Sequence, residues 1–136
     1  MTDPRVTLKD LIEDSWSLGD LLVKVSTEWY DAKEEMPQVT VGHTITTPEY
    51  VGLSDDIRNA LKRYRCVYTL DAWVKGSQEI RYRIVQEIKR IIGFHCNVAG
   101  GNLEFLEVSD WRDLDEPTYA PRLLRSQVHV EVLYYE

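Results

Sequence analysis

The sequence has little of several features that would each place it in a particular class of protein. Its two cysteines, Cys66 and Cys96, are too few for a disulfide framework, so we expect free thiols. No apolar run approaches the roughly 18 residues that span a bilayer, and the start, MTDPRVTLKD, lacks the apolar core of a secretory signal. The seven glycines and five prolines argue against a long disordered tail. We therefore expect a protein that folds inside a cell and has no membrane partner.

Motifs that carry chemistry are also scarce. The sequence has no Gly-rich phosphate loop and no G-x-S-x-G nucleophile turn. His43, His95, Cys66 and Cys96 are residue types that bind zinc, but they lack CxxC or HxxxH spacing, and adjacent ligands seldom chelate one tetrahedral ion. We predict no catalytic residue, no metal site and no cofactor, and we expect that the protein is not an enzyme.

The length and composition fit one globular domain. A chain of 136 residues buries most of its apolar surface without disulfides or metals. The fractions of 43% hydrophobic and 29% charged residues are typical of soluble globular proteins. We expect a single domain over residues 1–136, with a helix or arm at 1–18 and a core of sheet and helix at 21–136.

The net charge of -7 is unevenly distributed along the chain. Residues 1–56 hold twelve acidic and four basic side chains, residues 57–93 hold three and nine, and residues 94–136 hold eight and three. Phosphate contact needs a basic surface that neighbouring carboxylates do not dilute, so this layout is poor for general nucleic-acid binding. Complementary patches instead favour pairing with copies of the chain or with an oppositely charged partner. Any single charged residue is explained equally well by a solvated surface.

The first half of the chain predicts a short helix and a hairpin. Leu8, Leu11 and Ile12 have helical spacing and predict a helix over 7–14, with Thr7 as its N-cap. Apolar residues alternate over 21–29 and again over 39–45, and the polar turn between these runs indicates a hairpin. A further short helix is predicted from Ser54 to Lys62.

The middle of the chain predicts a strand that leads directly into an amphipathic helix. Alternation over residues 65–74 indicates the strand, and Gly76 ends it. Ser77 is the expected N-cap of the helix and Gly93 its expected C-cap. The apolar stripe of this helix is wide enough to pack on a sheet and consists of Ile80, Ile84, Val85, Ile88, Ile91 and Ile92.

The rest of the chain predicts two strands, at 103–108 and 128–135, on either side of a charged loop. Consecutive strands joined by tight turns favour antiparallel pairing, and one long helix suffices to cover one sheet face. We therefore predict an α+β fold: a mainly antiparallel sheet of about five strands, one long amphipathic helix packed on one face, and a short N-terminal helix.

The aromatic residues allow two interpretations. Trp29, Trp73 and Trp111 lie in or near the ends of predicted strands, where tryptophan anchors either a core or an interface. Tyr134 and Tyr135 near the end of the closing strand fit either role. If that strand is a sheet edge, pairing between subunits is one way to cover it.

One family resemblance emerges from the order of these elements. The strand ending in LDAWVKG, the helix QEIRYRIVQEIKRII, the strand LEFLEV, an acidic loop and the closing strand RLLRSQVHVEVLYYE resemble the small tail-terminator and tail-completion proteins of long-tailed viruses and proviruses. The similarity covers residues 21–136 and consists of element order and hydrophobic texture. It implies an α+β fold and a virion protein assembled in the host cytoplasm. It further implies a ring, commonly of six subunits, that caps the tail tube, contacts the head connector and lets DNA pass through its lumen.

Two other functions stay open at this level. A head-completion or neck-connector protein would show the same element order. An accessory protein that binds nucleic acid through the basic segment 57–93, or a small enzyme with an unrecognised site, belongs to a different class.

For the ring, we predict subunit and partner contacts in three places. These are the loop before the central strand, the basic side of the helix, and the acidic loop 110–116, whose carboxylates are dense enough for a hard cation but match no EF-hand. The predicted interface residues are Arg58, Lys62, Arg63, Arg81, Arg83, Asp110, Asp113, Asp115 and Glu116.

Overall fold

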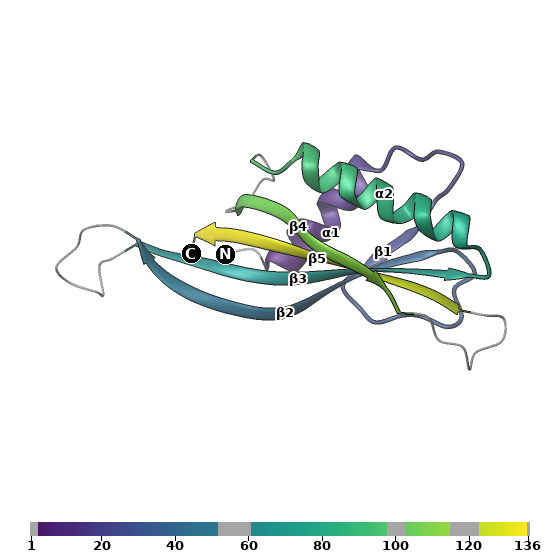
Figure 1. The fold of residues 1–136 in the computed structure, drawn as a ribbon, viewed down its shortest axis with the longest axis horizontal. Coiled ribbons are helices and arrows are strands. Elements are labelled where there is room, and N and C mark those ends of the chain that lie inside the picture. The colour runs from purple at the N-terminus through teal and green to yellow at the C-terminus, as the bar shows by residue number, and fades with distance from the viewer. Residues whose placement is uncertain (1–2, 52–60, 98–102, 115–122, 136) are drawn as a thin grey trace.

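The fold is a five-stranded sheet with two helices on one face (Figure 1). The structure is a computed structural model that describes residues 3–51, 61–97, 103–114 and 123–135. The strands lie in the order β1-β2-β3-β5-β4. The elements are α1 (Pro4–Ser15), β1 (Lys24–Ser26), β2 (Gln38–Val51), β3 (Leu61–Lys75), α2 (Gln78–Phe94), β4 (Leu103–Asp113) and β5 (Leu123–Tyr135).

The N-terminal helix begins earlier than the sequence pattern predicted. The Asp3 side chain, and not Thr7, is the N-cap: its Oδ1 accepts a hydrogen bond of 2.9 Å from the backbone N–H of Arg5. Pro4 occupies the first turn, where its missing N–H has no cost. The helix then buries Leu8 and Ile12 completely, which fixes it to the sheet and to α2.

The predicted central helix is confirmed as α2. The Ser77 hydroxyl accepts a hydrogen bond of 3.2 Å from the backbone N–H of Ile80, and Gly76 before it has a φ of 84°, which favours glycine. The helix ends later than predicted, because Gly93 and Phe94 remain helical and His95 is the C-cap. The apolar stripe faces the sheet, and its fully or almost fully buried members are Ile84, Val85, Ile88, Ile91 and Ile92.

The sheet is mixed, which corrects the expectation of a mainly antiparallel sheet. The strand predicted over 21–29 is only three residues long, β1, and it pairs in parallel with β2 through Lys24↔Gln38, Val25↔Val39 and Ser26↔Thr40. The predicted hairpin between 21–29 and 39–45 is therefore wrong. A parallel neighbour needs a crossover, and residues 27–37 supply it without a helix.

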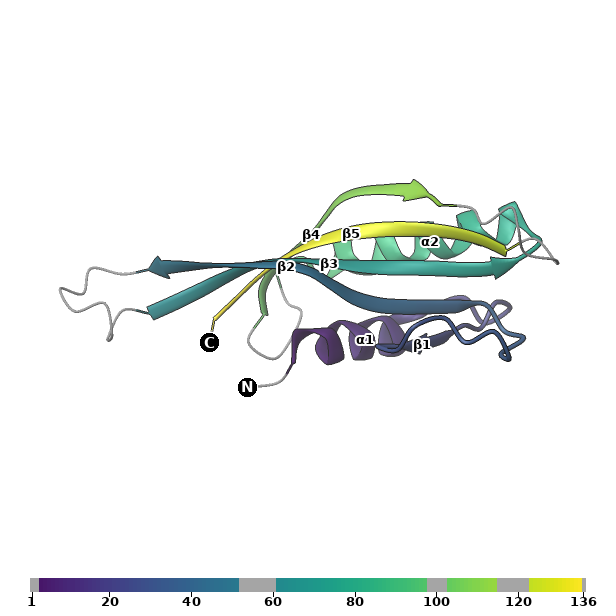
Figure 2. The ribbon, with the colours of Figure 1, turned by 90° about the horizontal axis from the view of Figure 1, so that it is seen from below.

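The long hairpin of the fold is instead formed by β2 and β3, which pair antiparallel from Gln38↔Trp73 to Val51↔Leu61. The predicted helix from Ser54 to Lys62 lies mostly outside the described residues, and its last two residues are wrong because Leu61 and Lys62 belong to β3. Figures 1 and 2 show this hairpin projecting beyond both helices. Only the first three residues of β2 pair with β1, so among the described residues positions 41–51 have a strand on one side alone.

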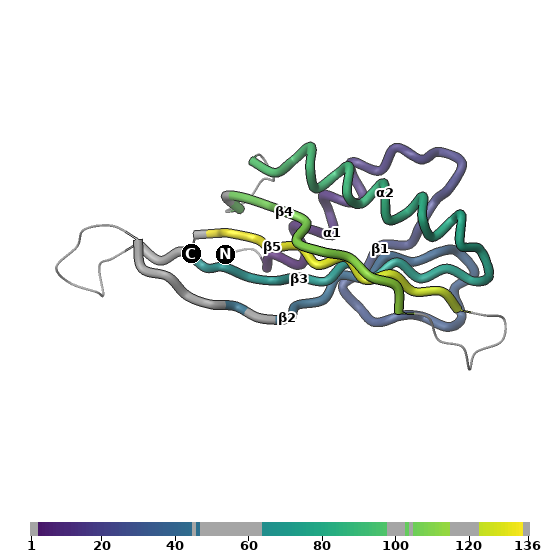
Figure 3. Tube along the Cα trace, viewed as in Figure 1, coloured from purple at the N-terminus to yellow at the C-terminus, as the bar shows by residue number. Residues whose placement is uncertain are grey.

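The two C-terminal strands are longer than predicted, and their order in the sheet is the reverse of their order along the chain. β4 continues through Asp113, so a segment expected to be loop is strand. The closing strand β5 is not an edge: it lies between β3 and β4 and pairs with both (Figure 3). Its central position explains why Val128, Val130 and Val132 are completely buried. The need to cover it by pairing between subunits therefore disappears.

Alternate residues of the strands build one core under the helices. β3 contributes Cys66, Tyr68, Leu70, Ala72 and Val74 to this core, as its alternation predicted. The opposite face of the sheet carries no helix of the described chain, and polar and aromatic side chains occupy it. Within the described ranges, neither helix is long and apolar enough to cross a membrane.

Candidate assembly surface

The helix-free face carries a cluster of aromatic and charged side chains that we name the Trp29 cluster: Trp29, Tyr30, Trp73, Asp71 and Arg125. The Trp29 ring meets the Trp73 ring edge-on, with 5.2 Å between centroids and 78° between planes. Tyr30 stacks on Trp73 at 4.9 Å and 24°. The guanidinium carbon of Arg125 lies 4.7 Å from the Trp73 centroid and 5.2 Å from that of Trp29. Arg125 therefore makes cation–π contacts with both indoles.

A buried ion pair anchors this cluster to the sheet. Arg125 Nη2 donates to Asp71 Oδ2 at 3.2 Å, and only 3% of the Asp71 side chain is exposed. Burial raises the pKa of Asp71 above its ordinary value of 3.8, and the charge and hydrogen bond of Arg125 oppose that rise. The Trp73 indole N–H donates to Thr40 Oγ1 at 2.9 Å, so this buried N–H is paired.

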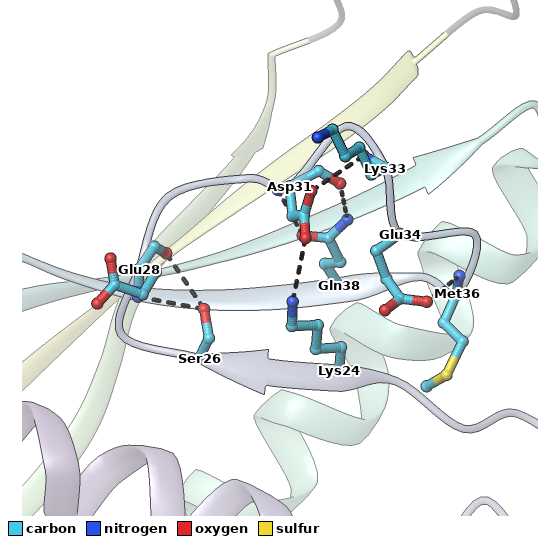
Figure 4. Close-up of polar contacts among 8 residues, drawn as sticks. All are labelled: Lys24, Ser26, Glu28, Asp31, Lys33, Glu34, Met36 and Gln38. Atoms are coloured by element: carbon cyan, nitrogen blue, oxygen red, sulfur yellow. Dashed lines mark hydrogen bonds and ion pairs between the residues drawn. The ribbon is translucent and has the colours of Figure 1, made fainter.

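Polar contacts hold the loop that carries Trp29 and Tyr30 (Figure 4). The Gln38 side chain makes two hydrogen bonds to the backbone of Asp31. Gln38 Oε1 accepts from the Asp31 N–H at 2.9 Å, and Gln38 Nε2 donates to the Asp31 carbonyl at 2.7 Å. The Asp31 carboxylate accepts from the backbone N–H of Lys33 at 3.0 Å and from Lys24 Nζ at 3.4 Å. The loop is thus held by hydrogen bonds within the chain, and 65% of the surface of Trp29 on this loop is exposed.

The predicted interface residues on the helix pair within the chain. Arg81 is almost completely buried and donates to Asp113 Oδ2 at 3.2 Å, so two residues predicted to contact neighbours contact each other. Asp113 Oδ1 also accepts from Ser126 Oγ at 2.6 Å. Arg83 forms an exposed ion pair of 2.9 Å with Asp20. The assembly role of these residues stays a prediction.

The remaining predicted residues lie on strands or outside the described chain. Lys62 and Arg63 belong to β3, not to a loop before it, because the β2–β3 ladder extends to Leu61. Asp110 belongs to β4, where its carboxylate contacts His129 Nδ1 of β5. The predicted residues outside the described ranges are Arg58, Asp115 and Glu116.

Most basic side chains of the segment 57–93 form ion pairs or a ring contact within the chain. From Arg65 onward, each of its described basic side chains has a partner in another element or on its own helix. Lys89 lies 5.5 Å above the Trp111 ring. The other contacts are the ion pairs Arg65–Glu131, Lys75–Glu35, Arg81–Asp113, Arg83–Asp20 and Arg90–Glu87.

A second polar junction ties the end of α1 to α2. Glu87 Oε2 accepts from the backbone N–H and from the hydroxyl of Ser17, both at 2.7 Å, and Oε1 accepts from Arg90 Nε at 2.6 Å. Arg90 also donates to the Ser15 carbonyl at 2.8 Å. Burial raises the pKa of Glu87, but the hydrogen bonds from Arg90 and Ser17 outweigh it, and the pKa lies below the ordinary 4.5.

One arrangement resembles a nucleophile with a relay. His43 Nε2 lies 2.6 Å from Thr46 Oγ1, which lies 3.1 Å from Cys66 Sγ. A nucleophile has to touch its substrate, and Cys66 is completely buried, so this contact serves packing. Burial also raises the pKa of the neighbouring Tyr68. In the part of the chain that the structure describes, no group of three His, Cys, Asp or Glu side chains is arranged to hold a metal ion.

Comparison with known proteins adds no family to this description. The sequence matches no protein-family model, and no curated protein matches it significantly. The geometry of the chain's own residues is therefore the basis for a functional proposal.

The sequence showed part of the Trp29 cluster. Trp29 and Trp73 were recognisable as anchors of a core or an interface, and Trp73 is buried while Trp29 is exposed. Asp71 and Arg125 were not recognisable as partners, because they are 54 residues apart and meet only through the pairing of β3 with β5.

Proposed function

We propose that this protein is a virion structural protein of the tail-terminator or tail-completion class. It assembles in the host cytoplasm, forms a ring on the end of the tail tube and joins the tube to the head connector. The observation that carries this proposal is the β2–β3 hairpin, which projects beyond the helices and has a strand on only one side of β2 over positions 41–51 among the described residues. The element order that resembles these viral proteins supports the same class.

The projecting hairpin favours association for a physical reason. β5 pairs with β3 as far as Arg63↔Tyr135, so β2 is the strand left with an open edge over positions 41–51 among the described residues, and an open edge gains stability when another surface covers it. The Trp29 cluster is a different surface, near the opposite end of β3. Contact between two unlike surfaces on identical chains is heterologous, and such contacts close into a ring when the rotation between neighbours permits. We expect six subunits and a lumen through which DNA passes.

The engaged basic side chains count against the nucleic-acid alternative. Binding to phosphates would have to compete with the ion pairs of Arg65, Arg81, Arg83 and Arg90. A head-completion or neck-connector protein remains the second candidate, because the same projecting hairpin serves a ring at that position. The two candidates differ in the partner that the ring binds.

The experiment is to add the purified protein to tail-tube protein while the tube assembles. Mass photometry over a dilution series measures self-association, and negative-stain microscopy measures tube length and the presence of rings at tube ends. We expect a species near six times the subunit mass and tubes that stop growing once capped. A ring that ignores the tube but binds the head connector indicates the neck role.

Two results would refute the proposal. One is a protein that stays monomeric at every concentration and leaves tube growth unchanged. The other is a shift of duplex DNA by the monomer with a steep loss of affinity as salt rises, which is the behaviour of a phosphate-binding protein.

A further inference from the structure

The outer edge of β1 is an unpaired strand edge. The Lys24 N–H donates to the Pro37 carbonyl, just before β2, at 2.9 Å. In a parallel ladder alternate residues bond to the same neighbour, so Lys24 and Ser26 face β2 and Val25 faces away from it. Because β1 ends the sheet order, no strand of the described chain lies on that outer side. The N–H and the carbonyl of Val25 are therefore open to a further strand.

A charged side chain does not guard this edge. Short edge strands and lysine side chains commonly prevent unwanted pairing, and β1 has three residues, of which one is Lys24. Figure 4 shows the Lys24 side chain directed across to Asp31 and away from the outer edge, with Nζ 3.4 Å from Oδ2. The edge is thus short, but its lysine is held elsewhere.

A hollow of about 480 Å³ lies beside β1, and its apolar lining comes from Trp16, Leu22, Val23 and Val25. The Trp16 indole N–H donates to the Leu21 carbonyl at 2.8 Å, which holds the ring in place, and Leu22 is 64% exposed. The Val25 side chain belongs to the core under the helices. Since paired residues of neighbouring strands project to the same face, a residue opposite Val25 would direct its side chain to this face. The hollow suits an apolar side chain there.

The rim of the hollow carries excess negative charge. Glu13 lines the hollow, and the Lys9 Nζ that lies 2.6 Å from its Oε1 also lies 3.8 Å from Asp10 Oδ1. One ammonium group thus serves two carboxylates. Lys24 lines the hollow as well, but Asp31 balances its charge. A basic side chain in a bound segment would meet this negative rim.

We propose that the outer edge of β1 receives an extended segment of a partner protein, with an apolar residue opposite Val25 and a basic residue two positions away. The backbone of this segment pairs with the N–H and carbonyl of Val25 and adds a strand to the sheet. Its apolar side chain enters the hollow, and its basic side chain, on the same face, lies near Glu13. Two copies paired through their β1 edges are disfavoured, because two acidic rims would then meet.

The first test uses a short synthetic peptide that alternates valine with threonine and has lysine two positions from its central valine. Hydrogen exchange of the isotope-labelled protein is followed by NMR. We expect saturating peptide to slow exchange of the Val25 N–H about tenfold or more and to change the Lys24 N–H little, because Lys24 is already bonded. The matched peptide carries N-methyl groups on the central valine and both its neighbours, which removes the donors, and should bind about tenfold more weakly.

The second test compares two exposed apolar side chains, with the dissociation constant measured by anisotropy of the labelled peptide. Leu22→Ser removes part of the hollow and should weaken binding about fivefold or more. Phe94→Ser, at a residue that is 77% exposed outside the hollow, should leave binding within about twofold. Glu13→Gln should weaken binding about twofold at low salt, with the difference vanishing as salt rises. Circular dichroism establishes that all three variants fold.

Three results would overturn the inference. One is equal binding of the N-methylated peptide, and another is a Val25 N–H that stays unprotected at millimolar peptide. The third is protection of the Val25 N–H by rising protein concentration without peptide, together with dimers in mass photometry, which would make a second copy the occupant. The peptide measurements use the single chain, so their result does not depend on whether the proposed ring forms.

Discussion

Replacement of Glu87 by glutamine tests how the N-terminal arm is held on the core. The Glu87 carboxylate is 4% exposed and accepts three hydrogen bonds, two from Ser17 and one from Arg90. Glutamine has the same shape but only one acceptor oxygen. Its NH₂ group must therefore face either the Ser17 donors or the Arg90 donor, so at least one donor loses its acceptor.

The magnitude follows from these contacts. A hydrogen bond to a charged group contributes about 1.5–3 kcal/mol, and a buried donor left without a partner costs about 1–3 kcal/mol. The glutamine oxygen can stay on both Ser17 donors, so the bond that is lost is the one from Arg90, which is 48% exposed and screened by solvent, together with the charge that strengthens the Ser17 bonds. We expect Glu87→Gln to lower the free energy of unfolding by about 1–2 kcal/mol at pH 7, which corresponds to a loss of about 5 °C in Tm.

The pH dependence identifies the charge as the cause. Because the folded protein holds the pKa of Glu87 below its ordinary 4.5, the ionised carboxylate stabilises the fold above that pH. This contribution is lost as the pH falls through the folded pKa, where the carboxylate takes up its proton. The difference between wild type and Glu87→Gln is therefore largest near neutrality and shrinks below pH 4.5.

Urea unfolding followed by tryptophan fluorescence, at pH 7 and at pH 3.5, measures both quantities. The matched control is Glu79→Gln, the same change on the same helix at an exposed site in its first turn, where the helix dipole accounts for about 0.3–1 kcal/mol. The reasoning fails if Glu87→Gln costs no more than the control, or if its cost is the same at both pH values.

Three further substitutions test the fold. Ile88→Ala removes a fully buried side chain and should lower the free energy of unfolding by about 2–5 kcal/mol in urea melts. Ser77→Ala removes the cap on Ile80 and should cost about 1 kcal/mol in the same assay, with Ser77→Asp restoring it. Gly42→Ala places a Cβ 2.8 Å from Thr69 Oγ1 and should lower Tm measurably. The double variant Gly42→Ala, Thr69→Ala removes the clashing hydroxyl and should recover the lost Tm. The double variant Gly42→Ala, Thr69→Ser keeps the hydroxyl and should not recover it.

The sequence predicted those elements well whose signals lie within a few neighbouring residues. Ser77, the apolar stripe and the alternation of β3 each predict their element from a few neighbouring residues, and α2 and β3 form as those signals indicate. The cap of α1 was misassigned because Asp3 lies before a proline, where the apolar periodicity has not yet begun. Such errors move a boundary and leave the element intact.

The sheet arrangement was harder to predict because it depends on distant partners. The alternation over 21–29 favoured a strand, yet Leu22 and Trp29 are exposed and only three residues join the sheet. Alternation reports which side chains can share a face and says nothing of the neighbour's direction. The parallel pairing of β1 and the interior position of β5 are decided by packing across the whole sheet.

The same distinction applies to the charges. The sequence predicted a basic surface over the segment 57–93. In the structure, the described basic side chains of this segment from Arg65 onward pair with carboxylates and one indole of the same chain. A chain with net charge -7 whose cations are mostly neutralised in this way presents a largely acidic surface to its copies. Acidic surfaces repel, so the proposed contact between copies has to join two complementary surfaces and not two copies of the same acidic surface.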